Sequence, residues 1–351
     1  MGTHDEDPDA QVASRAPDGI PPTFGAYVVE RRTDGLVQGV RELSPGDLPD
    51  GGTVVRVDWS AVNFKDGMVA TPGNRVARIS PLVPGVDLVG TVVASDTFAP
   101  GQAVIVHGHD LGVAHHGAYA EYARVPSAWA VPLPSGLTAR HAAVIGTAGF
   151  TAALSLRQLE RSGLEPSQGP VLVTGASGGV GSMTVALLAL HGYEVVASTG
   201  KQGEHDYLTR LGAAGVIGRD DLLADPDRTL GPERWAGAVD CVGGATLAQV
   251  LRTLRYGGAV AASGLTGGSA LETTVYPFIV RGVALLGVDT VRTPTEVRVA
   301  VWTQLAQEYP APLLDEMVAA ETGLGGIGEA LGSIAAGSVR GRVLVRPGGD
   351  A

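Results

Sequence analysis

The pattern of hydrophobic and polar positions changes near residue 147 of the chain. Before that point, short runs rich in β-branched residues alternate with clusters of Gly, Pro and Asp. This pattern predicts an all-β region with strands at 27–30, 54–59, 89–94 and 103–107. After that point, strand-length runs alternate with helix-length segments, which is typical of parallel strands joined by right-handed crossovers.

The second region contains enough strand-length runs for a complete doubly wound sheet of six strands. They lie at 171–174, 194–198, 215–218, 237–242, 259–264 and 284–289. We therefore predict an α/β fold in which a six-stranded parallel Rossmann sheet accompanies a β-rich domain, each with its own core. A last strand at 342–345 is expected to return to the β-rich domain.

The sequence VLVTGASGGVG at 171–181 predicts a strand, a glycine-rich turn and the start of a helix. Glycines allow a backbone to approach a diphosphate closely, and the helix start directs free N–H groups at the anion. The loop reads A-S-G-G-V-G, with Ala176 where the usual motif has its first glycine. Its place between a strand and a helix favours dinucleotide binding over an ordinary turn without a ligand.

The end of the second Rossmann strand distinguishes the two nicotinamide cofactors. An NAD site places a carboxylate there for the ribose 2′-hydroxyl, whereas this chain has Ser-Thr-Gly-Lys at 198–201. Hydroxyls and a cation suit a 2′-phosphate, so NADPH is the expected cofactor. Lys201 alone would be weak support, because a solvated lysine at a strand end is common.

Composition and charge limit the partners of the chain. Its 351 residues include 25 basic and 36 acidic side chains, for a net charge of −11. This charge opposes binding to nucleic acid or an anionic membrane except through a local basic pocket. The single cysteine, Cys241, excludes an intrachain disulfide and fits a reducing cytoplasm. No apolar run reaches the roughly 18 residues of a membrane span, so we expect a soluble cytoplasmic protein.

Five segments carry a resemblance to a known family. They read VNFKDGMVAT, PLVPGVDLVGTV, IGTAGFTAAL, VLVTGASGGVGS and TTVYPFIVRGVALLGVDTV. Their order and spacing resemble the medium-chain dehydrogenase/reductase superfamily, its zinc-free quinone oxidoreductase branch and, within it, the bacterial acrylyl-CoA reductase (NADPH) family. The resemblance covers residues 24–346. It implies a GroES-like catalytic domain at 24–147 and 290–351 and a Rossmann NADPH-binding domain at 148–289, after a disordered tail at 1–23.

The residues oppose a metal site. Val86 stands where alcohol dehydrogenases of the superfamily have a zinc-binding histidine, and no cysteine lies near the start of the chain. Histidines gather at 107, 109, 115 and 116, but without a cysteine among them. We read them as part of a loop that lines the cleft or faces solvent, rather than as a metal site.

The resemblance implies direct hydride transfer from the nicotinamide to an activated alkene, with donors holding the thioester oxygen where enolate charge builds up. Catalytic candidates are Asn63, Lys65 and Tyr119. Asn63 has an alternative role in a turn that ends a strand, and Tyr119 one in core packing. Relatives often have tyrosine where this chain has Phe64, so that proton donor is missing here. Asp66 is expected to be structural.

Cofactor contacts carried over by motif fall into three groups. Those for the pyrophosphate are Ser177, Gly178, Gly179 and Val180; those for the 2′-phosphate are Thr199, Gly200, Lys201 and Arg219; and those for the nicotinamide half are Phe64, Leu265, Ile279 and Thr290. Gly337 is expected to contribute only its backbone. Arg340 and Arg342 are expected either to bind phosphates or to be solvated.

Three functions remain open from the sequence. The first is NADPH-dependent reduction of a short 2-enoyl thioester of the acrylyl-CoA type, and the second is reduction of a quinone or enone. The third is a non-catalytic NADPH-binding protein. The apolar strand at 284–288 is expected at a sheet edge and predicts a homodimer.

Overall fold

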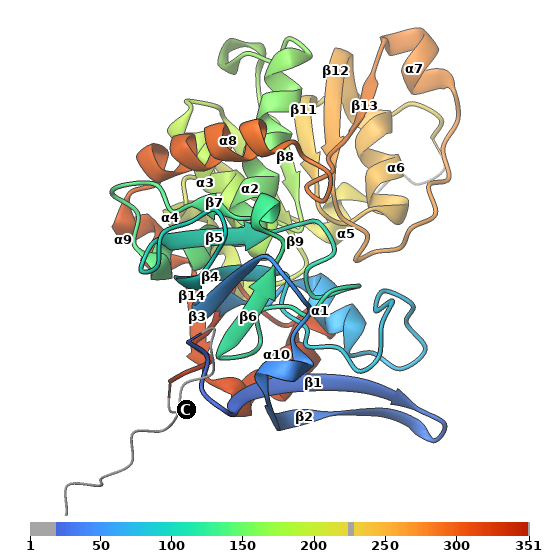
Figure 1. Cartoon of the computed structure of the whole chain (residues 1–351). Helices are drawn as coiled ribbons and strands as arrows, with labels where there is room; N and C mark the ends of the chain where they lie inside the picture. Colours follow the sequence, from blue (N-terminus) through green and yellow to red (C-terminus); the bar gives the residue numbers. More distant parts are fainter. Residues whose placement is uncertain (1–18, 224–227, 350–351) are drawn as a thin grey trace, which may run out of the picture.

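A computed structural model of the chain describes residues 19–223 and 228–349. A parallel sheet flanked by helices forms one half, and a β-rich part lies against its lower edge (Figure 1). No helix among these residues has the length and apolarity that a membrane crossing requires.

The parallel sheet has six strands in the order β10-β9-β8-β11-β12-β13. This is the doubly wound order of a dinucleotide-binding sheet, so the fold prediction is confirmed. The strands are β8 (Val171–Thr174), β9 (Val195–Thr199), β10 (Gly215–Gly218), β11 (Trp235–Asp240), β12 (Leu254–Ala262) and β13 (Ala284–Gly287). Cys241 follows β11 instead of lying within it, and β13 is the edge strand, as expected.

The β-rich part contains a seven-stranded sheet and a hairpin. The sheet order is β14-β15-β3-β4-β5-β7, with β6 paired to β3. Its strands are β3 (Thr53–Ala61), β4 (Asp87–Ala94), β5 (Ala103–His107), β6 (Tyr122–Val125), β7 (Val131–Pro132), β14 (Val318–Thr322) and β15 (Arg342–Val345); the hairpin is β1 (Phe24–Arg32) and β2 (Gly35–Leu43). The last strand, β15, pairs with β3 and so returns to this part as predicted.

Helices connect the strands and cover the Rossmann sheet (Figure 1). The first region has α1 (Phe64–Val69), and α2 (Ala139–Arg161) leads into the second. The others are α3 (Gly179–Leu190), α4 (His205–Arg210), α5 (Arg219–Leu222), α6 (Gly244–Thr253), α7 (Tyr276–Arg281), α8 (Thr295–Glu308), α9 (Ala311–Glu316) and α10 (Ile327–Ala335).

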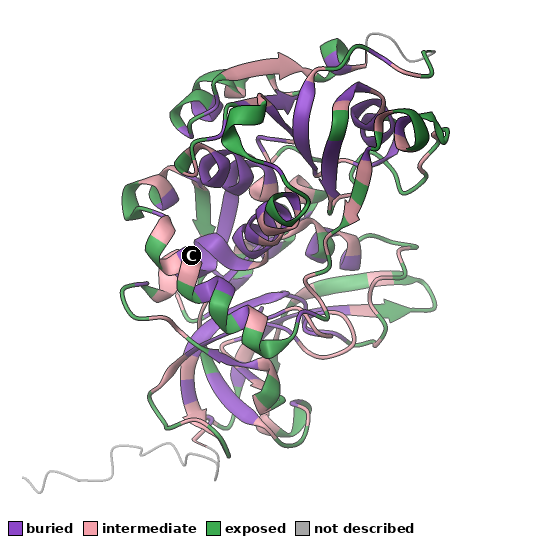
Figure 2. Cartoon of the chain, turned by 90° about the horizontal axis from the view of Figure 1, so that it is seen from above, coloured by how far each residue is buried: buried purple, intermediate pink, exposed green. Residues whose placement is uncertain are grey.

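The helix α2 joins the two halves, because its apolar residues pack against both sheets. Val89 and Ile105 of the β-rich sheet belong to the same buried cluster as Val144 of α2 and Val171 of the Rossmann sheet. Figure 2 shows buried residues continuing through the middle of the molecule. The expectation of two separate cores is therefore wrong at this boundary.

The helix α2 is interrupted at Gly146, whose φ of 45° and ψ of −156° are not helical. A Cβ atom at this position would lie 2.4 Å from Oδ2 of Asp87, so only glycine fits. The break directs the backbone N–H of Thr147 at the Asp87 carboxylate, 2.8 Å away.

The predicted disordered tail at 1–23 lies mainly outside the described residues. Its last residues are described, and Ile20 among them is fully buried in the core of the β-rich part. The tail prediction is wrong for this stretch, because Ile20 packs in the same apolar cluster as Phe24 and Tyr27.

Candidate active site

The glycine-rich loop between β8 and α3 forms an anion cradle. Gly178 is the N-cap of α3 and offers no side chain, so the N–H groups of the first turn have no side-chain partner. A Cβ atom on Gly181 would lie 2.3 Å from the carbonyl oxygen of Gly175. Glycine is therefore required for the tight turn, and the loop fits the pyrophosphate of a dinucleotide.

The residues expected at the 2′-phosphate lie together at the end of β9. The hydroxyls of Ser177 and Thr199 are 2.9 Å apart, and the backbone N–H of Lys201 donates to Thr199 Oγ1 at 3.1 Å. The Arg219 guanidinium lies over Gly200, since a Cβ there would be 2.9 Å from Nη2. Two cations and two hydroxyls thus surround one strand end.

The segment before β15 closes over the cradle. The N–H of Gly341 donates to the carbonyl of Ser177 at 2.9 Å, and Lys201 Nζ donates to the carbonyl of Val339 at 2.5 Å. Partial burial lowers the pKa of Lys201. Gly337 is exposed with a φ of 69°, and Arg340 lies 4.8 Å from the centre of the Tyr207 ring. Arg340 is therefore not simply solvated, and a contact with a phosphate stays a prediction.

Arg342 is buried and has protein partners. Its guanidinium forms an ion pair with Asp87 at 3.1 Å and donates to Asn63 Oδ1 at 3.0 Å. It also donates to the carbonyl of Val144 at 3.0 Å. The side chain is 2% exposed, so the expectation of a solvated charge is wrong, whereas a contact with a phosphate stays a prediction. A Cβ on Gly179 would lie 3.0 Å from its Nη1, so its positive charge adjoins the cradle.

Asn63 is fixed by the same network. Its Nδ2 donates to Asp87 Oδ2 at 2.8 Å and to the carbonyl of Ala61 at 3.3 Å. Both amide hydrogens are used, so the expected amide donor to a substrate oxygen is not available in this arrangement. Asn63 is also the N-cap of α1, so it lies where that helix begins.

The first turn of α1 presents one exposed and one buried charge. Lys65 is exposed and has no ion pair among the described residues, whereas Phe64 is half-buried. Asp66 is fully buried and accepts hydrogen bonds from the N–H groups of Asn63, Gly85 and Val86. Burial raises the pKa of Asp66 to about 6. Asp66 thus anchors the 84–86 turn, as expected of a structural residue.

Tyr119 lies in the core of the β-rich part. It has no exposed surface, and its hydroxyl donates to the carbonyl of Ala61 at 3.4 Å. Burial raises the pKa of Tyr119 well above its usual value. A proton donor must reach the substrate, so the sequence-based assignment of Tyr119 as a catalytic residue is not supported by this placement.

Besides Phe64, the residues expected around the nicotinamide are Leu265, Ile279 and Thr290, which lie on or just after the Rossmann half. Leu265 and Ile279 are 45% and 72% exposed, and the carbonyl of Thr290 accepts from Arg298 at 2.7 Å. Their role at the nicotinamide stays a prediction.

Arg298 is a site-supporting residue that the sequence analysis missed. It is buried and donates to the carbonyls of Thr290, Val291 and Thr293, where the chain leaves the Rossmann half. It also donates to the carbonyl of His107 at 2.9 Å. An arginine inside an ordinary helix pattern gives no local signal of such a contact. Arg298 therefore holds the segment 290–293, where the chain returns from the Rossmann half, against the end of β5.

Of the histidines at 107, 109, 115 and 116, His107 is buried at the end of β5 and so does not lie in the expected loop, while His109 and His115 both contact Trp129. His107 accepts from Trp302 Nε1 at 2.9 Å, His109 stacks on Trp129, and His116 Nδ1 accepts from the N–H of Val83. Among residues 19–223 and 228–349, no three His, Cys, Asp or Glu side chains gather as a metal ligand set. Val86 is an apolar, buried residue.

Two family models match the chain in separate stretches. The alcohol dehydrogenase GroES-like domain matches residues 49–135, and the zinc-binding dehydrogenase model matches residues 179–307. The acrylyl-CoA reductase AcuI of Ruegeria pomeroyi is 47% identical over 328 residues, which cover 92% of this chain and 98% of the relative. The chain belongs to the zinc-free quinone oxidoreductase branch of the medium-chain dehydrogenase/reductase superfamily.

Solved structures of this branch have the same architecture. Escherichia coli YhdH with bound NADPH is 43% identical and matches with a TM-score of 0.89 over 92% of this chain and 99% of that one. Bacillus subtilis YhfP, which carries a provisional quinone oxidoreductase name, is 46% identical and matches with the same TM-score and coverage. Its solved structure has NAD bound. As a member of this branch, the chain is an oxidoreductase, and the predicted resemblance is confirmed.

Proposed function

We propose that this oxidoreductase reduces the C=C bond of a short 2-enoyl thioester, of the acrylyl-CoA type, with NADPH. The observation that carries the proposal is the 47% identity to an acrylyl-CoA reductase over nearly the whole of both chains. The cradle of glycines and the hydroxyl and cation set at the end of β9 fit the cofactor that this reaction needs.

The chain uses an NADP-type dinucleotide, in agreement with the bound NADPH of YhdH. A bound NADPH supplies a hydride for the electron-poor carbon. The N–H groups of the α3 N-terminus would hold the pyrophosphate, and Lys201 with Arg219 would hold the 2′-phosphate. The NAD in the YhfP structure makes the preference between NADPH and NADH a quantity to measure.

The chain's own residues orient the reacting groups. The Asp87, Asn63 and Arg342 network fixes the start of α1, and Arg298 fixes the crossover at Thr290. Phe64 supplies an apolar surface, since it lacks the hydroxyl that relatives often have there. With Tyr119 buried, we propose that solvent protonates the α-carbon after hydride addition.

Reduction of a quinone or enone is a second candidate, because YhfP carries a quinone oxidoreductase name at 46% identity. Both reactions add a hydride to an electron-poor acceptor. They differ in whether the coenzyme A part of the substrate contributes to its affinity for the enzyme.

The test is NADPH oxidation by the purified chain with acrylyl-CoA, crotonyl-CoA, a simple enone and a simple quinone, repeated with NADH. We expect the highest kcat/KM for acrylyl-CoA with NADPH. Turnover of the quinone with inactivity on both thioesters would favour the second candidate. Tight NADPH binding without turnover of any acceptor would contradict both.

A further inference from the structure

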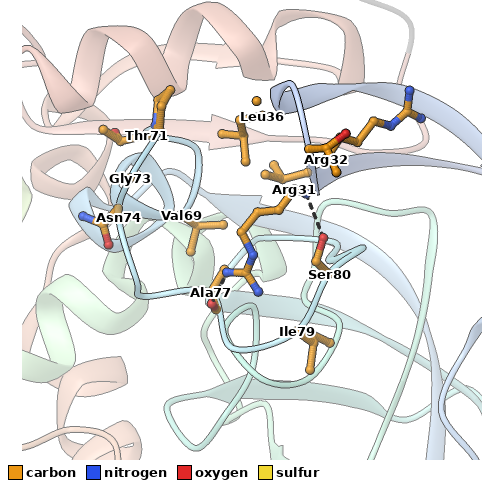
Figure 3. A pocket seen from close by; sticks show the side chains of 14 residues that line it. Arg31, Arg32, Leu36, Val69, Thr71, Gly73, Asn74, Ala77, Ile79 and Ser80 are labelled. Carbon is orange, nitrogen blue, oxygen red and sulfur yellow. Dashed lines mark hydrogen bonds between the residues drawn. The ribbon is translucent and has the colours of Figure 1, made fainter.

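A cavity of about 270 Å³ lies between the tip of the β1–β2 hairpin and the segment 69–80, which runs from the end of α1 (Figure 3). We call it the hairpin cavity. Arg31 extends from the hairpin between the two segments, whereas Arg32 points away. Neither the glycine cradle nor the end of β9 contributes to it. It is therefore a separate site within the described residues.

The polar wall of the hairpin cavity has hydrogen-bond donors to spare. Arg31 donates one N–H to the carbonyl of Ala77 at 2.6 Å, and its other guanidinium N–H groups have no partner among the described residues. Ser80 Oγ accepts from the N–H of Arg31 at 2.8 Å, so its own hydrogen remains available. Asn74 uses its carbonyl for the N–H of Val76, leaving its amide hydrogens. None of the described lining residues is a carboxylate.

Part of the lining of the hairpin cavity is apolar. Leu36, Val69 and Ile79 contribute to it. An apolar lining with a guanidinium and neutral donors suits a purine nucleotide, whose base is flat and whose phosphates are charged. The chain carries a net charge of −11, so an anionic ligand needs such a local cation.

The position of the hairpin cavity relates it to the active site. Val69, at the end of α1, lines the cavity, while Phe64, at the start of the same helix, is the residue expected beside the nicotinamide. Six helical residues rise about 9 Å. The pantetheine arm of coenzyme A is an extended chain that separates a thioester from its nucleotide, and it suits such a separation.

We propose that the hairpin cavity binds the 3′-phosphoadenosine diphosphate end of coenzyme A, with Arg31 on a phosphate. The inference rests on the proposed function, because it assigns the coenzyme A part of the thioester substrate to this second nucleotide site. The site differs from that of NADPH, whose phosphates are assigned to the glycine cradle, Lys201 and Arg219.

The test compares two thioesters that share the reacting group. Arg31→Gln should raise KM for acrylyl-CoA about tenfold while leaving kcat unchanged, because one charge-assisted contact is lost. KM for acrylyl-pantetheine, which lacks the nucleotide, and KM for NADPH should change less than about twofold. An equal change for both thioesters, a change in KM for NADPH instead, or no change for acrylyl-CoA would overturn the proposal.

Arg41→Gln is the matched control. Arg41 lies on the same hairpin, pairs with Glu30 at 2.7 Å and does not line the cavity. It should leave all three KM values unchanged. If Arg31→Gln does not fold, Asn74→Ala replaces it, with the same expected split between the two thioesters.

Direct binding separates failure of this inference from failure of the proposed function. Adenosine 3′,5′-bisphosphate should bind the wild-type chain in calorimetry, bind Arg31→Gln about tenfold more weakly, and compete with acrylyl-CoA. If the chain reduces no enoyl-CoA, the proposed function fails, but this binding result still decides the cavity's ligand. Absence of binding to the wild-type chain would overturn the inference.

Discussion

Asp87 and Arg342 are 255 positions apart in the chain, yet their carboxylate and guanidinium lie 3.1 Å apart with each side chain 2% exposed. The pair joins the start of β4 to the start of β15 beneath the glycine cradle. Asn63 and Thr147 complete the hydrogen bonds of the carboxylate. A buried pair of this kind is costly to break on one side only, because the remaining charge loses its partner.

Arg342→Met is therefore expected to lower the free energy of unfolding by about 3–5 kcal/mol. Urea unfolding of wild type and variant measures this change. Arg140 provides a control, since its ion pairs with Asp315 and Glu321 lie at the surface and Arg140→Met should cost less than about 1 kcal/mol. Similar losses in the two variants would contradict the importance assigned to the buried pair.

Removing both cations at the end of β9 should change cofactor preference. Lys201→Gln combined with Arg219→Gln is expected to raise KM for NADPH about tenfold or more and leave KM for NADH within about twofold. Steady-state kinetics with each cofactor checks this. Arg210 lies on nearby α4 and forms an exposed ion pair with Glu316 of α9. Arg210→Gln removes this pair and should change KM for neither cofactor. A parallel rise for both cofactors would refute the assignment of the 2′-phosphate.

Tyr119→Phe tests the discarded proton donor. The hydroxyl is buried against the carbonyl of Ala61, so its removal should change kcat less than about twofold while lowering stability by about 1 kcal/mol. The measurement is kcat with the preferred acceptor across a range of pH. A large loss of kcat in a folded variant would restore Tyr119 to the catalytic residues.

Asp66 should give a distinctive dependence of stability on pH. Burial raises the pKa of Asp66 from 3.8 to about 6. Its protonated form stabilises the fold below about pH 3.8, and this contribution is lost as pH rises to about 6. The free energy of unfolding of the wild type, minus that of Asp66→Asn, should therefore fall by about 3 kcal/mol across that window. Urea unfolding at a series of pH values measures the difference.

Asp315→Asn is the control for that series. The Arg140 guanidinium beside Asp315 holds the pKa of this exposed carboxyl below its usual value. The contribution of Asp315 to stability is therefore lost as pH falls. The free energy of unfolding of the wild type, minus that of Asp315→Asn, should rise weakly with pH. If both differences in free energy of unfolding changed in the same direction with pH, the argument from burial of Asp66 would be disproved.

The dimer stays a proposal, supported by an exposed apolar surface beside the sheet edge. Val275, Tyr276, Ile279 and Val280 at α7 and Leu285 of β13 are all at least 39% exposed. Val280→Glu should convert a dimer to a monomer in size-exclusion chromatography with light scattering. Val40→Glu on the hairpin is the matched control, because Val40 and Val280 are both 52% exposed. It should leave the dimer intact. A monomeric wild-type chain would exclude the proposal.

Local features of this protein were predictable from its sequence. The bounds of β8, β10 and β15 match the predicted ranges, because a β-branched run between turn residues determines a strand within a few positions. The glycine cradle and the 198–201 strand end were also predictable, since each motif is contiguous and its chemistry depends on neighbouring residues.

What depends on distant contacts was decided only by the tertiary structure. Arg342 at the start of a last strand resembles a solvated charge until β15 is placed beside β3 and Asp87. The roles of Tyr119 and Arg298 likewise follow from burial against residues far along the chain. The hydrophobic pattern specifies which face of an element is buried, but the partner of a buried charge is chosen by how the elements pack.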